Sequence, residues 1–113
     1  MGLEIVSRRP QELYENIARV SVVLTNKGDV AGSEVAQLYI QAPGSDTRAL
    51  RGFAKEFLRP GASVSISFKL RKKDVSEWDS VSSSWVIPKG THKLFVGSSV
   101  LDIKSEKSYE FSS

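Results

Sequence analysis

The sequence predicts an all-β sandwich of about seven short strands, and three observations support this prediction. The run from Ser63 to Leu70 alternates strictly between polar and apolar residues, as in a strand with one buried and one wet face. Turn-forming residues recur between such runs along the chain. The chain has 113 residues and no cysteine, so we expect one domain with neither disulfides nor a thiolate metal site.

The first half of the chain supplies four strands, predicted at residues 18–25, 34–41, 50–58 and 63–70. The first of them places Val20, Val22 and Leu24 on one face. The second is apolar or amide-bearing on both faces, as expected of a central strand. In the third, Gly52 marks a bulge or a close approach of another chain segment.

The second half begins with an interruption of the strand pattern. Asp74 precedes Glu77 by three residues, which is the spacing of a helix capping box, so we expect one helical turn over 74–79. Further strands are predicted at residues 85–87, 91–96 and 101–111. The predicted core between the two sheets consists of Val22, Leu24, Leu38, Val64, Ile66, Phe68, Leu94 and Val96.

The N-terminal residues fit this pattern worst. We expect residues 1–17 to form a divergent segment, with a candidate first edge strand at Leu3–Val6, and residues 18–113 to form the sandwich domain. The start of the chain lacks the apolar core of a signal peptide. Either the protein stays inside the cell or the chain is a fragment whose true N-terminus lies elsewhere; an extracellular location would follow if the parent is secreted.

Charge and hydropathy argue against two classes of partner. The net charge is +3 and the pI about 9.3, but the cations are scattered, with short runs at residues 8–9 and 71–73. A nucleic-acid interface needs clustered cations to follow the phosphates. No apolar run approaches the ~20 residues of a membrane span. We therefore expect neither nucleic acid nor membrane as a partner.

Six short motifs follow one another between Val20 and Ile103. They read V-x-L-T-N-K-G-D-V-A-G-S-E-V-A-Q-L-Y-I, L-R-G-F-A-K, L-R-P-G-A-S, D-V-S-E-W-D, W-V-I-P-K-G and F-V-G-S-S-V-L-D-I. In this order they resemble the C-terminal fibronectin type III-like domain of glycoside hydrolase family 3 enzymes, the β-glucosidases and β-xylosidases. The chain departs from the family pattern in residues 1–17 and at His92, where the family usually has tyrosine.

The resemblance implies a non-catalytic accessory domain that gives structural support and docks on catalytic domains of the same parent. The parent would be a retaining glycosidase whose nucleophile and acid/base residues lie outside this chain, and no cofactor or metal is implied. The alternative is a free-standing carbohydrate-binding or protein-interaction module. Solvent exposure of the two tryptophans distinguishes the accessory domain from the carbohydrate-binding module, because the rings of a sugar-binding platform must be exposed and coplanar.

Asp74, Glu77 and Asp79 form the densest acidic cluster, and three roles are open to it. Glycoside hydrolysis needs two carboxyls across a sugar, and three carboxylates can also bind calcium. The cluster lacks the glycine-punctuated calcium-loop pattern. We favour capping by Asp74 and Glu77 and a turn at Asp79, because a cap explains the spacing without a pocket.

His92 is the chain's single histidine, so any catalytic triad or zinc site would have to use it. No cysteine could share a metal with it, and the G-x-S-x-G elbow of serine hydrolases is absent. We therefore expect His92 to be a packing residue, more than half buried, with a pKa lowered by burial.

Aromatic residues give the remaining candidate sites. Trp78 and Trp85 are the candidates for a sugar-stacking platform, although packing at the sandwich edge is the favoured interpretation. Tyr39, Phe53 and Phe57 are the candidates for interdomain docking, and at least one of these rings is expected to be exposed, beside the loop 43–49. In solution, weak self-association as a two-fold dimer could bury such a patch.

Overall fold

The computed structural model describes residues 3–7, 16–99 and 101–111, and most of them belong to strands. The elements are β1 (Leu3–Ser7), β2 (Asn16–Thr25), β3 (Gly32–Gln41), β4 (Ala49–Leu58), β5 (Ser63–Arg71), the 3₁₀ helix η1 (Lys72–Val75), β6 (Glu77–Asp79), β7 (Ser84–Val86), β8 (His92–Ser99) and β9 (Asp102–Tyr109). The four strands predicted in the first half are found within one or two residues of their expected bounds.

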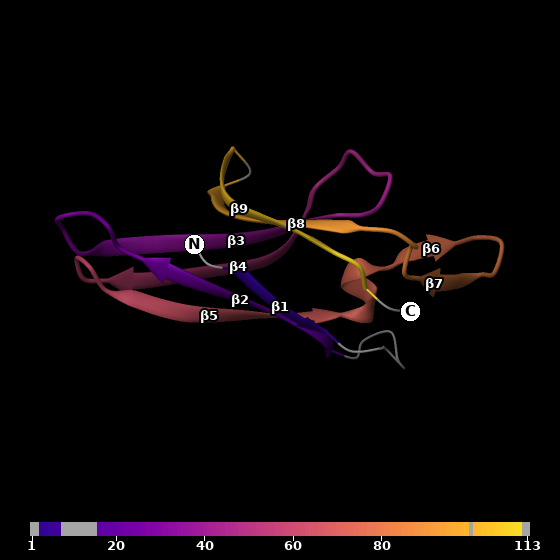
Figure 1. Ribbon diagram of the computed structural model, residues 1–113, viewed down its shortest axis with the longest axis horizontal. Helices are drawn as coiled ribbons and strands as arrows, with labels where there is room; N and C mark the ends of the chain where they lie inside the picture. Colours follow the sequence, from indigo (N-terminus) through magenta and orange to yellow (C-terminus); the bar gives the residue numbers. More distant parts are fainter. Residues whose placement is uncertain (1–2, 8–15, 100, 112–113) are drawn as a thin grey trace.

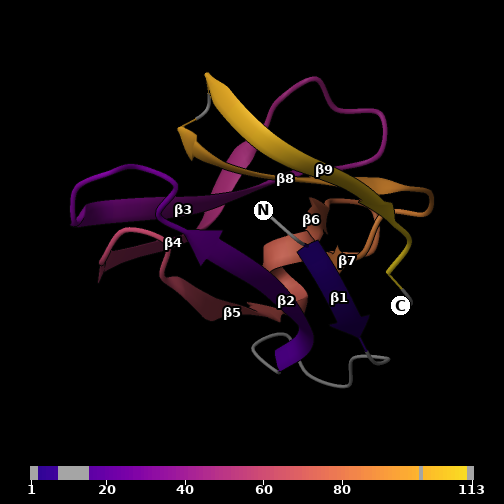
Figure 2. The same ribbon diagram turned by 60° about the vertical axis from the view of Figure 1, so that its left-hand side comes forward.

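Two antiparallel sheets face each other, as the sequence predicts for a sandwich (Figures 1 and 2). One sheet has the order β1-β2-β5 and the other β4-β3-β8-β9. A third, two-stranded sheet, β6-β7, projects from one end of the molecule beside η1 (Figure 1). The all-β sandwich is therefore confirmed.

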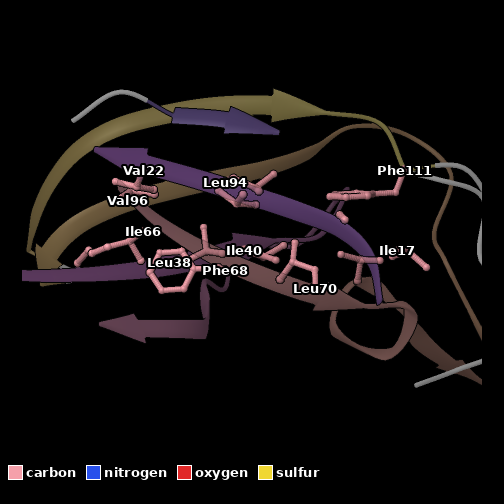
Figure 3. Close-up of a cluster of buried hydrophobic side chains, with 14 of the residues drawn as sticks. Ile17, Val22, Leu38, Ile40, Ile66, Phe68, Leu70, Leu94, Val96 and Phe111 are labelled. Carbon is pink, nitrogen blue, oxygen red and sulfur yellow. The ribbon is translucent and has the colours of Figure 1, made fainter. Parts of the chain in front are cut away.

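The core lies between the two main sheets. Figure 3 shows Val22, Ile66 and Phe68 from one sheet pointing toward Leu38 and Leu94 from the other. Every predicted core residue is buried except Val64, which is partly buried and packs against the cluster. The core also includes residues outside the predicted set, namely Ile17, Ala18, Val20, Ala36, Ile40, Leu58, Leu70, Val75, Ile87 and Phe111.

The N-terminal segment is described in part. β1 lies at the edge of its sheet and pairs with β2, with Leu3 opposite Val22. Ile17, at the start of β2, is almost completely buried. Residues 1–2 and 8–15 of the predicted divergent segment lie outside the described residues, so the division at residue 17 stays a prediction.

The helical turn predicted over 74–79 is wrong in its placement. The single turn is η1, and Asp74 is its third residue, where its carboxylate accepts the backbone N–H of Arg71 at 2.7 Å. In η1 the capping box is formed by Arg71 and Asp74, whereas Glu77 begins β6, opposite Val86. The spacing of Asp74 and Glu77 predicted a longer helical turn, but β6 and β7 form a hairpin directly after η1. The cross-strand pair of Trp78 and Trp85 stabilises this hairpin.

Gly52 confirms the predicted close approach. A Cβ atom at this position would lie 2.5 Å from Cδ1 of Phe68, inside the sandwich. The register between β3 and β4 also shifts here, from Leu38 opposite Gly52 to Tyr39 opposite Leu50, so Arg51 is passed over as in a β-bulge. On β4, therefore, the inward side next to Phe68 has room for a glycine alone.

Candidate functional site

The outer face of the four-stranded sheet has a row of large apolar side chains. Tyr39 stands opposite Phe95 on one side and Leu50 on the other, and all three point away from the core. Tyr39 and Phe95 are nevertheless buried, and the guanidinium of Arg48 lies 3.9 Å from the centre of the Phe95 ring. The Tyr39 hydroxyl donates to Oε1 of Gln37. Neighbouring side chains thus cover Tyr39, which corrects its place among the candidates for an exposed docking ring.

The rest of this row is open to solvent. Leu50, Phe53 and Phe57 on β4 are 49%, 57% and 70% exposed, so the expectation of at least one exposed ring is confirmed. The position predicted for the exposed ring, beside loop 43–49, is wrong for Phe57. Phe57 lies opposite Ser33, at the far end of β4. Leu50 was missed from the sequence because the bulge at Arg51 breaks its alternation with Phe53.

The two tryptophans meet on the β6-β7 hairpin. Their ring centres are 5.8 Å apart, and the ring planes are inclined at 72°, an edge-to-face arrangement. Trp78 is 55% exposed, whereas Trp85 is partly buried with Nζ of Lys73 5.2 Å from its ring centre. The pair therefore presents one exposed indole and no flat two-ring platform.

His92 lies in the core beside η1. Its Nε2 is 3.2 Å from the carbonyl oxygen of Val75, to which it can donate, and its ring packs edge-on against Phe111. The side chain is 1% exposed, and Nδ1 has no partner in the part of the chain that the structure describes. Burial lowers the pKa of His92, opposed by the Val75 carbonyl and by Glu77. Its predicted packing role is confirmed.

The acidic cluster is divided among separate local tasks. Asp74 caps η1, while Asp79 accepts the N–H of Val81 at 3.2 Å and the hydroxyl of Ser82 at 2.7 Å, as expected of a turn former. These hydrogen bonds, that from Ser82 foremost, lower the pKa of Asp79. Among residues 3–7, 16–99 and 101–111 there is no group of three side chains suited to a metal ion.

Among the described residues, two of the hollows that are open to solvent have charged groups in their lining. One of about 530 Å³ lies between β2 and the ends of β3, β8 and β9, and its charged groups include the ion pair of Asp102 with Lys104 at 3.1 Å. One of about 180 Å³ lies between loop 42–49 and η1, next to Arg51 and Glu77. In the described chain, no helix is both long and apolar enough to cross a bilayer.

Comparison with known proteins places this geometry in a family. Residues 34–100 match the model of the fibronectin type III-like domain. The chain is 44% identical over 110 residues to probable β-glucosidase L of Aspergillus fumigatus, covering 94% of this chain and 15% of that protein. It is 41% identical to β-glucosidase cel3A of Pyricularia oryzae, again covering 15% of the relative. The chain thus spans about one seventh of the curated relatives it matches.

Solved structures agree with this assignment. The β-D-glucoside glucohydrolase of Trichoderma reesei superposes with a TM-score of 0.91 at 35% identity, covering 99% of this chain and 18% of that one. A family 3 β-glucosidase of Neurospora crassa superposes with a TM-score of 0.79 at 37% identity, covering 86% and 12%. In these homologues the domain is part of a larger enzyme. The chain belongs to the fibronectin type III-like domain family and corresponds to the C-terminal domain of glycoside hydrolase family 3 β-glucosidases.

Proposed function

We propose that this chain is a non-catalytic accessory domain that supports the catalytic domains of a family 3 β-glucosidase and docks on them. The observation that carries the proposal is coverage: the whole sandwich matches about 15% of such an enzyme. The parent would hydrolyse β-linked glucosides or xylosides with retention. That reaction needs two carboxyls about 5–5.5 Å apart across the sugar. In this chain, the carboxylate of Asp74 caps η1, and the carboxylate of Asp79 accepts a hydrogen bond within a turn.

Two measurements test this proposal. The isolated chain is expected to hydrolyse no aryl-β-glucoside above the solvent rate. Turnover that disappears in Glu77→Gln or Asp79→Asn would contradict it. In a β-glucosidase whose matching region is replaced by this chain, deleting the chain should shorten the half-life of activity at elevated temperature. An unchanged half-life would remove the supporting role.

A carbohydrate-binding module is the second candidate, because Trp78 is 55% exposed. A single exposed indole can stack on one sugar ring, although the 72° between Trp78 and Trp85 gives no continuous platform. Titrating cello-oligosaccharides against tryptophan fluorescence tests this function. Saturable quenching that is lost in Trp78→Ala but kept in Val81→Ala would establish it.

A further inference from the structure

We infer that the outward face of β4, formed by Leu50, Phe53 and Phe57 around Lys55, is the surface on which the catalytic part of the parent enzyme docks. This inference rests on the proposed function and assigns the contact to one face of one strand. We call these four residues the β4 face. Its occupant is a second region of the same polypeptide.

The first argument is that the outer face of the sheet is covered in one half and bare in the other. Tyr39 and Phe95 are 9% and 3% exposed, with Arg48 lying over Phe95. Along β4 the exposure rises from 49% at Leu50 to 70% at Phe57. The chain therefore covers its own aromatic rings near β8 and leaves those on β4 without cover. Adjacent exposed apolar side chains of this size mark an interaction site.

The second argument is that these rings contribute nothing to the core of the domain. The inward side of β4 has Gly52 against Phe68 and Ala54 against the core cluster. Phe53 and Phe57 project from the opposite side, where no core exists. Two phenylalanines on an outward face cost solubility without adding to the stability of the free domain. A partner that covers them explains their presence.

The third argument concerns which partner fits. The chain spans 12–18% of the homologous enzymes described above, so a large, covalently linked protein surface accompanies this domain in each of them. The outward positions of β3 and β4, all of which are described, include Lys55 and no carboxylate. Glu34 and Glu56 pair on the inward side of the same strands. The complementary surface is therefore apolar, with a carboxylate that can meet Lys55.

The experiment uses the β-glucosidase L of Aspergillus fumigatus with its matching region replaced by this chain. The double variant Phe53→Ser/Phe57→Ser should shorten the half-life of activity by about tenfold or more, because losing the burial of even one phenyl ring at the contact corresponds to about that factor. Lys55→Glu should shorten the half-life more than Lys55→Gln does, since it repels the expected carboxylate. The matched control is Val30→Ser/Leu101→Ser, which removes two apolar groups that are 78% and 94% exposed elsewhere.

Each outcome bears on the inference separately from the proposed function. A shorter half-life for the β4 variant with an unchanged control supports the docking face, provided that the isolated variant keeps its unfolding midpoint. Equal half-lives for β4 and control variants overturn it. If deletion of the whole domain still destabilises the enzyme, the supporting function survives with another contact surface. The isolated chain could instead sediment as a dimer that Phe57→Ser dissociates. If the half-lives of the β4 and control variants in the enzyme are also equal, the docking inference is overturned, and the β4 face binds a second copy of the chain.

Discussion

β4 and β5 each lie at an edge of one of the two main sheets, and they distribute their apolar side chains in opposite ways. On β5, Ile66 and Phe68 point into the core, and serines alternate with them on the outside. On β4 the large rings are outside, and Gly52 faces inward. The difference arises because the ring of Phe68 already fills the space that a side chain at position 52 would take.

This comparison separates two kinds of information in a sequence. Alternation with a period of two identifies a strand, but it leaves open which of the two sides is buried. For β5 the side with the large apolar side chains is the core side, whereas for β4 that side faces solvent. Four tests, taken from the largest expected effect to the smallest, can break or sharpen this contrast.

The largest effect is expected at Phe68, the phenylalanine that lies on the core side. Phe68→Ala should lower the free energy of unfolding by about 3–5 kcal/mol, the range for deleting a buried aromatic side chain. Urea unfolding of the isolated chain measures this. A loss below about 1 kcal/mol, the size usual for surface positions, would mean that β5 is not the strand that fills the core.

A smaller effect is expected at Gly52. Gly52→Ala places a Cβ atom 2.5 Å from Cδ1 of Phe68, so the ring or the strand must shift. Overpacking of this kind typically costs about 1–3 kcal/mol. The penalty should shrink in the background Phe68→Leu, because the two positions are in contact. Additive effects in this double-mutant cycle would show that the steric conflict is not what keeps β4 small on its inner side.

His92 brings a titrating group to the inner side of the sandwich. Because burial lowers its pKa in the folded state, the unfolded chain binds a proton more readily. Its contribution to stability is therefore complete above its ordinary pKa of about 6.5 and is lost as pH falls below that value, by at most about 1.4 kcal/mol per pH unit.

His92→Tyr is the matched variant, and the difference between its pH profile and that of the wild type isolates the histidine from the carboxylates. Chemical unfolding between about pH 5 and 8 measures both profiles. Parallel profiles, or an NMR titration that finds a raised pKa for His92, would contradict the expectation.

The smallest effect is expected on the outer side. In the isolated chain, Phe53→Ser and Phe57→Ser should each change the free energy of unfolding by less than about 0.5 kcal/mol. Both rings are more than half exposed and lie outside the core cluster. A destabilisation as large as that of Phe68→Ala would show that the β4 rings pack within the domain, and the docking face would then have to be sought elsewhere.

The sandwich could be predicted from the sequence because local signals agree with the global fold. Val64, Ile66 and Phe68 alternate with polar neighbours, and turn residues separate their strand from the one before it. The motifs between Val20 and Ile103 added the family, which periodicity alone could not. The helical turn failed because a D-x-x-E spacing cannot distinguish a cap from the start of a hairpin when tryptophans follow.

The candidate sites were harder to predict, since exposure depends on tertiary neighbours. Tyr39 and Phe57 have equal standing in the sequence, yet Tyr39 is buried between Leu50 and Phe95, and Phe57 is the most exposed of the three proposed rings. The alternation of β3 identifies the face on which Tyr39 lies, but it does not show that Phe95 of β8 lies beside Tyr39 or that Arg48 covers Phe95. Likewise, the angle between Trp78 and Trp85 is fixed by their pairing across the hairpin.

Lys55 has a further consequence for the domain when its partner is missing. β4 is an edge strand, so one side of its backbone is open to a strand from another copy. An antiparallel pairing that set Phe53 against Phe57 of a second copy would also set Lys55 directly against its own counterpart. Like charges directly opposite each other are destabilising. A single cation between two rings thus acts as a gatekeeper: it disfavours this edge-to-edge assembly while leaving the face of the strand free for a partner with a carboxylate.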